Sequence, residues 1–205
     1  MTGQLPPLMV ISDRQQARYS LDQIAAWSFH TGLRSFMLRD RDLPMAERAA
    51  LAERLAESAR AHGAQLIING DWTLAREVGA AGVHLQQPGE IPIARSRLGA
   101  AALIGLSAHS REDLVAAAAE GADYTTLSPI FLSQSKPGYG PALGLEGLRK
   151  EAASLSPPLL ALGGINTTNA RDCLEAGAVG VAVMGEVMRA EAPGEVVLQL
   201  LQALR

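Results

Sequence analysis

The segment SFMLRDRDLPMAERAALAERLAESARAHGAQLIIN (35–69) contains one complete repeating unit of this chain. Its two ends, SFMLR and QLIIN, are short apolar runs, and its middle is rich in Ala, Leu, Glu and Arg, which favour helix. Leu51, Leu55 and Ala59 recur four residues apart, as they do on one face of a helix. The segment therefore predicts two parallel strands joined by a crossover helix.

The same unit recurs along the whole chain. The apolar runs are too short for amphipathic helices and are typical of strands buried on both faces. Eight such units predict one domain over residues 1–205, an α/β fold of the (β/α)8 or TIM barrel type. An open doubly wound sheet, usually of about six strands, is the alternative. The eight runs are LMVIS (8–12), SFMLR (35–39), QLIIN (65–69), GVHL (82–85), LIGLS (103–107), YTTLS (124–128), LLALG (159–163) and VGVAVM (179–184).

Composition excludes several classes of protein. Hydrophobic residues make up 48% of the 205 residues, which excludes a disordered chain. The 18 basic and 21 acidic residues leave a net charge of −3, which argues against a nucleic-acid partner. The single cysteine, Cys173, excludes an intramolecular disulfide and a zinc site made of cysteines.

The chain also lacks the sequence patterns of a membrane or secreted protein. No apolar run approaches the roughly 20 residues that span a bilayer. A secretory signal has a basic segment followed by an apolar one, and the N-terminal residues MTGQLPPLMVISDR lack this pattern. We therefore expect a cytoplasmic protein without a membrane partner. The sequence leaves its oligomeric state, including a homo-oligomer, undecided.

Glycines follow the seventh and eighth apolar runs, where a barrel of this type places its active site. Gly163 and Gly164 end the seventh run, and Met184 and Gly185 end the eighth. Glycine-rich loops at these two places form the recurring phosphate site of such barrels, with backbone N–H groups facing the anion. Tight packing between helix and strand is the alternative explanation of the glycines.

Cationic and hydroxyl side chains follow other runs. The loop SQSKPGYGPALG (133–144) carries Lys136 beside Ser133 and Ser135, a combination that suits a phosphate or diphosphate, although a solvated surface loop explains it equally well. Arg39 and Arg41 lie two apart, so a strand would turn both to one side, where they could hold an anion. Surface ion pairs with Asp40 and Asp42 are the alternative, and the outward alternation of those aspartates argues against it.

One histidine is the better candidate for proton transfer. His109 follows the fifth apolar run and precedes a helical stretch, which makes it the candidate general acid–base group. His84 lies inside a strand, where a hydrogen-bonded core role is the simpler interpretation. The four histidines show no spacing typical of a zinc site.

Taken together, the strand ends resemble the thiamine-phosphate synthase/TenI family, over nearly the whole chain. That family is a small (β/α)8 barrel that binds the thiazole phosphate of thiamine biosynthesis. No one segment is diagnostic, but their order and spacing are specific. The segments are LIIN (66–69), AAGVHLQQ (80–87), IGLSAHS (104–110), GADYTTLSPIF (121–131), SQSK (133–136), LALGGIN (160–166) and AGAVGVAVM (176–184).

The resemblance implies a role for each matching residue. Its phosphate cradle corresponds to Gly163, Gly164, Met184 and Gly185, and its polar substrate contact after the fifth strand corresponds to Ser107. The residues that hold diphosphate in the synthases correspond to Arg39, Arg41, Asn69, Ser133, Ser135 and Lys136.

Two departures from the family pattern bear on a metal ion. The synthases hold magnesium with two aspartates, and the matching positions here are Gly70 and Gly89. Losing both carboxylates should greatly weaken chemistry that needs magnesium on a leaving diphosphate. Asp71 and Glu90 lie one residue further on, and they are the candidate metal ligands if the protein is a synthase. Otherwise we expect no cofactor.

Three hypotheses follow from the resemblance. The slightly favoured one is a TenI-type thiazole tautomerase, which needs neither diphosphate nor metal. Its proton-shuttling histidine corresponds to Pro129 here, so His109 or Glu186 would move the proton, with Lys136 and Arg39 on the anionic groups. The second is a thiamine-phosphate synthase that couples an aminopyrimidine diphosphate to thiazole phosphate and uses Mg²⁺. The third is a non-catalytic protein that binds thiazole phosphate.

Overall fold

The fold is a closed barrel of eight parallel strands, as the repeating units predict. The computed structural model describes residues 5–133, 135, 138, 140–153 and 157–205. Each strand pairs with the next along the chain, and β8 pairs with β1 to close the barrel. An open doubly wound sheet is therefore excluded. The strands are β1 (Leu8–Ile11), β2 (Ser35–Leu38), β3 (Gln65–Asn69), β4 (Gly82–Leu85), β5 (Leu103–Ala108), β6 (Tyr124–Leu127), β7 (Leu159–Leu162) and β8 (Gly180–Val183).

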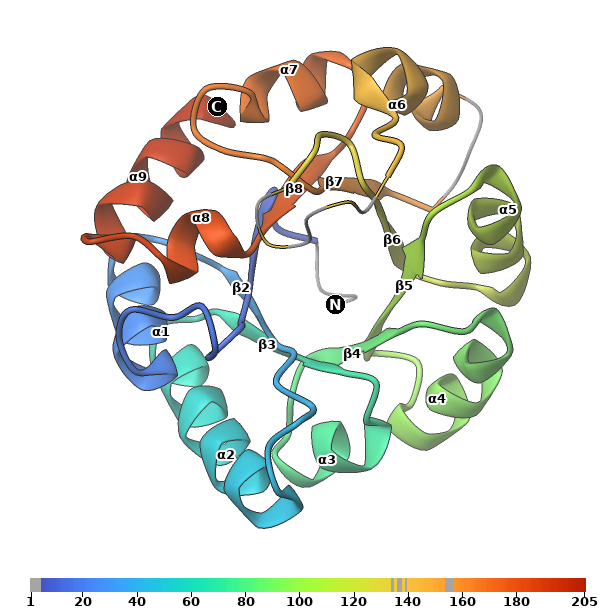
Figure 1. The fold of residues 1–205 in the computed structure, drawn as a ribbon. Coiled ribbons are helices and arrows are strands. Elements are labelled where there is room, and N and C mark those ends of the chain that lie inside the picture. The colour runs from blue at the N-terminus through green and yellow to red at the C-terminus, as the bar shows by residue number, and fades with distance from the viewer. Residues whose placement is uncertain (1–4, 134, 136–137, 139, 154–156) are drawn as a thin grey trace.

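Helices surround the barrel on its outside (Figure 1). None of the helices in the described ranges combines the length and the apolar character of a membrane span. The helices are α1 (Leu21–His30), α2 (Met45–Ala61), α3 (Trp72–Glu77), the 3-10 turn η1 (Pro88–Glu90), α4 (Ile91–Leu98), α5 (Arg111–Glu120), α6 (Gly144–Ala152), α7 (Ala170–Glu175), α8 (Gly185–Met188) and α9 (Pro193–Ala203).

Local sequence explains where several helices begin and end. Ser20 and Ser110 cap α1 and α5, and each accepts a backbone N–H of the first turn. Asp71 caps α3 in the same way, with its carboxylate accepting the N–H of Leu74. Gly121 ends α5 in the left-handed conformation at φ +82°, which glycine adopts without steric cost.

Apolar side chains fill both the barrel and the layer between barrel and helices. Strand residues that point inward, among them Met9, Ile67 and Leu160, form one buried cluster inside the barrel. Residues that point outward, among them Val10 and Ile68, pack on the helices. This double burial explains why the strands are continuous apolar runs rather than alternating ones.

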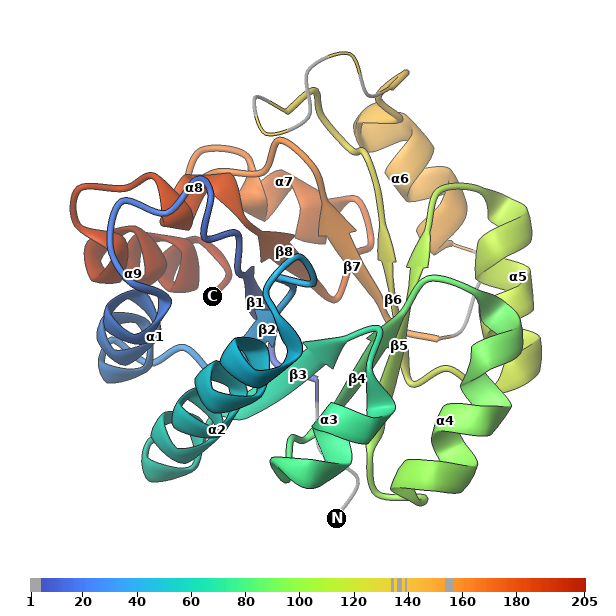
Figure 2. The same cartoon turned by 60° about the horizontal axis from the view of Figure 1, so that its bottom comes forward.

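The strand polarity places every carboxyl end at one rim of the barrel, which we call the carboxyl rim. Figure 2 shows helix α8, which follows β8, on this side. Residues that follow the strands therefore converge there, although they are far apart in the sequence.

A tightly packed glycine in β5 gives a test of the barrel interior. A Cβ atom on Gly105 would collide with the ring of Tyr124 and lie 2.6 Å from His84 Nδ1. We expect Gly105→Ala to lower the free energy of unfolding by about 1–3 kcal/mol, because overpacking forces the buried rings apart. Gly89→Ala is the matched control, since a Cβ there meets no atom within 4 Å. Equal denaturant midpoints for the two variants would contradict this packing.

Candidate functional site

Two adjacent cavities open at the carboxyl rim. The larger, of about 410 Å³, lies over the barrel centre and is called the central cavity here. The smaller, of about 220 Å³, is lined by Gly163, Gly164 and Gly185 and is called the glycine pocket. Ser133 and Ser135, among others, line both cavities, so the two cavities are adjacent. A ligand or ligand pair with two separated polar groups could extend across both.

The glycine pocket has glycines at these positions because neighbouring atoms lie too close to its backbone for a side chain. Gly163 and Gly164 have φ values of +99° and +63°, which glycine tolerates best. A Cβ on Gly164 would lie 2.5 Å from the carbonyl oxygen of Leu132, and one on Gly185 would collide with Arg189 and Ser135. Tight packing therefore explains these glycines. The same glycines leave the backbone of the pocket without side chains that would cover it, so the packing explanation and the phosphate-site explanation are compatible.

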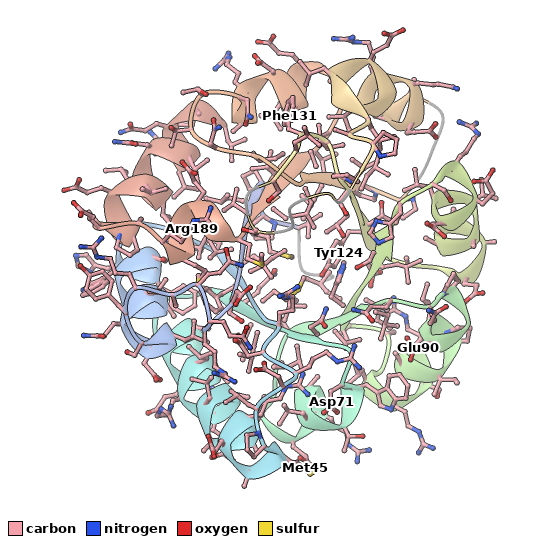
Figure 3. The ribbon with its side chains drawn as sticks, in the orientation of Figure 1. Met45, Asp71, Glu90, Tyr124, Phe131 and Arg189 are labelled. Carbon is pink, nitrogen blue, oxygen red and sulfur yellow. The ribbon has the colours of Figure 1, made fainter. Side chains whose placement is uncertain are left out.

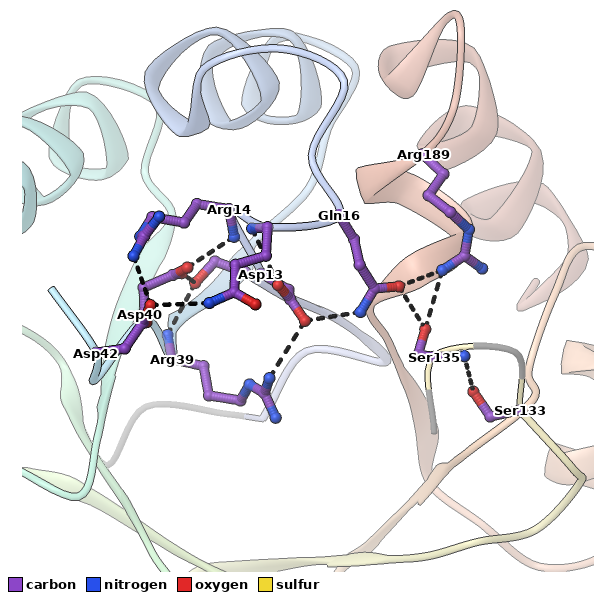
Figure 4. Close-up of polar contacts among 11 residues, drawn as sticks. Asp13, Arg14, Gln16, Arg39, Asp40, Asp42, Ser133, Ser135 and Arg189 are labelled. Carbon is purple, nitrogen blue, oxygen red and sulfur yellow. Dashed lines mark hydrogen bonds and ion pairs between the residues drawn. The ribbon is translucent and has the colours of Figure 1, made fainter. Parts of the chain in front are cut away.

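A polar network joins the two arginines Arg39 and Arg189 across the rim (Figure 4). Arg39 Nη2 donates to Asp13 Oδ2 at 3.3 Å, and Gln16 Nε2 donates to the same oxygen at 2.7 Å. Arg189 Nη1 donates to Gln16 Oε1 and, at 3.0 Å, to Ser135 Oγ. The network positions the Arg189 guanidinium at the edge of the glycine pocket, which Arg189 also lines.

Arg189 carries a positive charge that no carboxylate in the described ranges neutralises by an ion pair. Its hydrogen-bond partners Gln16 and Ser135 are neutral. A guanidinium with neutral hydrogen-bond partners is suited to an anion with several oxygens.

The floor of the central cavity contains a buried histidine. His84 is 2% exposed, and its Nε2 lies 3.0 Å from Ser107 Oγ while its Nδ1 lies 3.2 Å from the hydroxyl of Tyr124. Burial lowers the pKa of His84 to about 3, so the imidazole is neutral at physiological pH. The hydrogen-bonded core role predicted for His84 is confirmed, and the residue also lines the cavity and orients Ser107.

His109 also lines the central cavity, at its β5–β6 side. Its Nδ1 lies 2.9 Å from the carbonyl oxygen of Ser128. Because a carbonyl oxygen only accepts, Nδ1 carries the proton, and Nε2 is the basic nitrogen of the neutral ring. His109 thus lies at the cavity wall with its ring held by the backbone after β6.

The prediction that Arg39 and Arg41 share one side of a strand is wrong, because β2 ends at Leu38, before both arginines. Arg39 lines the central cavity, whereas Arg41 lies further out and donates to Gln86 Oε1 at 3.1 Å. The outward orientation expected for Asp40 is wrong.

The Asp40 side chain is buried instead, because it accepts hydrogen bonds from Ser12 Oγ at 2.5 Å and from the N–H of Arg14 at 2.6 Å. The other aspartate of the run, Asp42, pairs with Arg14 at 2.5 Å. Neither aspartate forms the surface pair with Arg39 or Arg41 that was the alternative explanation.

Comparison with known proteins shows the family to which this chain belongs. A sequence profile described as thiamine monophosphate synthase matches residues 8–187. The chain belongs to the thiamine monophosphate synthase family. It is 38% identical over 187 residues to a thiamine-phosphate synthase of Roseiflexus castenholzii, covering 90% of this chain and 82% of that one.

Two further relatives agree with this family. A thiamine-phosphate synthase of Chromobacterium violaceum is 41% identical over 170 residues, covering 82% of this chain and 81% of that one. The solved structure of a thiamine phosphate pyrophosphorylase from Pyrococcus furiosus superimposes with a TM-score of 0.85 at 30% identity, covering 96% and 94% of the two chains. The resemblance inferred from the strand ends is confirmed.

The family implies Mg²⁺, and the residues present here do not fit a magnesium site. Asp71 uses one carboxylate oxygen to cap α3 and the other to pair with Arg48 at 3.2 Å. Glu90 Oε2 accepts the N–H of Gln87 at 3.3 Å. Figure 3 shows Asp71 at α3 and Glu90 near α4, both farther from the barrel centre than Tyr124. In the described part of the chain, no cluster of three or more His, Cys, Asp or Glu could hold a metal ion.

The predicted site residues otherwise gather where the family resemblance implies. The glycine pocket is lined by Gly163, Gly164, Met184, Gly185, Ser133 and Ser135, and the central cavity by Arg39, Asn69, Ser107 and His109. Lys136 lies outside the described residues. Sequence reasoning missed Gln16 and Arg189, because each lies several residues beyond its strand end and no motif marks it.

The buried His84 predicts a pH effect on stability. In the unfolded chain its pKa is near 6.5, and in the folded protein burial lowers it to about 3. As pH drops, the unfolded state protonates His84 before the folded state does. The free energy of unfolding therefore falls below about pH 6.5, by up to ~1.4 kcal/mol per pH unit from this group. Denaturation at pH 7 and at pH 5 should show that the free energy of unfolding falls less in His84→Gln than in the unaltered protein. If that variant does not fold, imidazole nitrogen shifts that show a charged His84 at pH 5 would contradict the prediction.

The Arg189 guanidinium gives a test of the glycine pocket. We expect Arg189→Gln to weaken binding of inorganic phosphate by about tenfold, the loss typical of one charge-assisted contact. Arg171→Gln is the matched control, because Arg171 lies on α7 in an exposed pair with Glu175. The measurement is calorimetric titration, and equal phosphate affinities for the two variants would argue against anion binding by Arg189.

Proposed function

We propose that the protein is a thiamine-phosphate synthase, which joins an aminopyrimidine diphosphate to a thiazole phosphate. The observation that supports this most directly is that the glycine pocket and the central cavity are adjacent and share Ser133, Ser135 and Met184 in their lining. Two substrates that each carry an anionic group can lie side by side in two such cavities. The relatives named thiamine-phosphate synthase support the same proposal and favour it over the tautomerase hypothesis.

The thiazole phosphate would occupy the glycine pocket. The backbone N–H groups of Gly164 and Gly185 would face the phosphate, with the hydroxyls of Ser133 and Ser135 beside them. Arg189 would balance the charge from the open side. The thiazole ring would then lie against Met184, which lines both cavities.

The aminopyrimidine diphosphate would occupy the central cavity. Arg39, Arg41 and Lys136 would hold the diphosphate oxygens. Asn69 Oδ1 is buried and has no hydrogen-bond partner among the described residues, so the amino group of a pyrimidine could donate to it. Ser107, held by the neutral His84, would contact the same ring.

The reaction requires positioning and charge neutralisation. The ring nitrogen of the thiazole attacks the methylene carbon of the pyrimidine, a C–N bond forms, and the C–O bond to the diphosphate breaks. The diphosphate leaves with the electron pair of that bond. Guanidinium groups at the rim stabilise the negative charge that develops on the leaving oxygen. The closed cavity floor of Met9, Met37 and Tyr124 limits attack by water.

A thiazole tautomerase is the second candidate, and one observation favours it. The two positions at which the synthases hold magnesium are Gly70 and Gly89 here. In that case His109 Nε2 would take and return the proton at the thiazole ring, and no diphosphate would be needed. His109→Ala would then abolish tautomer conversion.

The first experiment is a product assay with the purified chain. We expect thiamine phosphate to form from aminopyrimidine diphosphate and thiazole phosphate, detected after oxidation to a fluorescent thiochrome. Conversion of a thiazole carboxylate phosphate tautomer without thiamine phosphate formation would contradict the synthase proposal and favour the tautomerase. Tight thiazole phosphate binding without turnover of either kind would indicate a carrier.

Ser107 provides the mutational test. We expect Ser107→Ala to lower kcat/KM for thiamine phosphate formation by about tenfold or more, since it removes a hydrogen bond inside a buried cavity. Ser96→Ala is the matched control, because Ser96 is exposed and bonds only locally to the carbonyl of Ile93. Unchanged kinetics for Ser107→Ala would show that this hydroxyl does not contact the substrate.

A further inference from the structure

A guanidinium group lies over the backbone position that carries a magnesium ligand in the synthases. Gly70 has a φ of +71°, and a Cβ built on it would lie 3.3 Å from both Cζ and Nη1 of Arg41. Any side chain at this position would therefore contact Arg41. A positive side chain occupies the space where a carboxylate and its metal ion would be needed.

The surroundings of Arg41 are already positive. Arg48, whose side chain is only 11% exposed, lies beneath the same turn and donates to the carbonyl oxygen of Asn69 at 2.8 Å. Burial lowers the pKa of Arg48, and the positive Arg41 lowers it further, while Asp71 and Asp40 raise it. A divalent cation placed here would be repelled by two guanidinium groups at short range.

The carboxylates near Arg41 are engaged elsewhere. Asp71 accepts the N–H of Leu74 on one oxygen and pairs with Arg48 on the other, so a metal ion would compete with both contacts. Arg41 itself forms no ion pair with a carboxylate in the described ranges, and its hydrogen bond goes to the neutral Gln86. Its charge is therefore available to an anion that enters the central cavity, which Gln86 lines.

We propose that this chain binds an organic diphosphate without a divalent cation, with Arg41 and Arg39 supplying the positive charge. The identity of the diphosphate as the aminopyrimidine substrate rests on the proposed function. The metal-free binding rests on Gly70, Arg41, Arg48 and Asp71 alone. Guanidinium groups suit this task, because they stay charged and contact two phosphate oxygens at once.

The experiment is calorimetric titration of the full chain with inorganic diphosphate and with aminopyrimidine diphosphate. Each titration is done in EDTA and in excess MgCl2. We expect binding in EDTA to be as tight as in magnesium or tighter, because free Mg²⁺ competes with the protein for the diphosphate. Arg41→Gln should weaken binding in EDTA by about tenfold. Arg54→Gln is the matched control, since it removes the same charge from an exposed arginine paired with Asp22 on the outer surface.

Two outcomes would overturn the proposal. One is binding of inorganic diphosphate that appears only with magnesium, and the other is unaltered binding by Arg41→Gln in EDTA. The product assay separates this proposal from the proposed function. Metal-free, Arg41-dependent diphosphate binding without thiamine phosphate formation would support the proposal and remove the synthase function. Thiamine phosphate formation with strictly magnesium-dependent binding would overturn the proposal and support the synthase function.

Discussion

Pairing of β8 with β1 closes the barrel, and the whole site depends on this closure. Leu8, Met9 and Val10 align with Val181, Ala182 and Val183 in parallel register. Because all eight strands run the same way, closure brings the residues after β1, β2, β6, β7 and β8 to one rim. The glycine pocket is the direct result: its glycines follow β7 and β8, its serines follow β6, and Gln16, which holds its arginine, follows β1.

Charge at this rim is arranged around arginines and not around a carboxylate cluster. Arg39 and Arg48 are each paired with one aspartate, whereas Arg41 and Arg189 have neutral hydrogen-bond partners. The glycines make this possible, since a side chain at Gly70 would contact Arg41 and one at Gly185 would collide with Arg189. In the proposed function, the glycines and the guanidinium groups without a carboxylate partner bind the anions together.

The sequence predicts the barrel well and the site unevenly, for physical reasons. Eight apolar runs with helical segments between them specify strand number and direction, because double burial demands continuous apolar strands. The glycines after β7 and β8 could also be predicted, since their position in the fold follows from strand order. Arg189 and Gln16 could not, because their meeting depends on loop paths that no local pattern describes. The burial of Asp40 could not be predicted either, because it depends on Ser12, a contact across 28 residues.

The central claim is that two anionic substrates occupy the two adjacent cavities, with the phosphate in the glycine pocket and the diphosphate at the arginines after β2. A crystal structure with thiazole phosphate and inorganic diphosphate bound together tests it most directly. The account predicts phosphate oxygens within hydrogen-bond distance of the N–H groups of Gly164 and Gly185, and diphosphate oxygens on Arg39 and Arg41. Phosphate bound away from these glycines, or diphosphate held through a metal ion on Asp71, would contradict it.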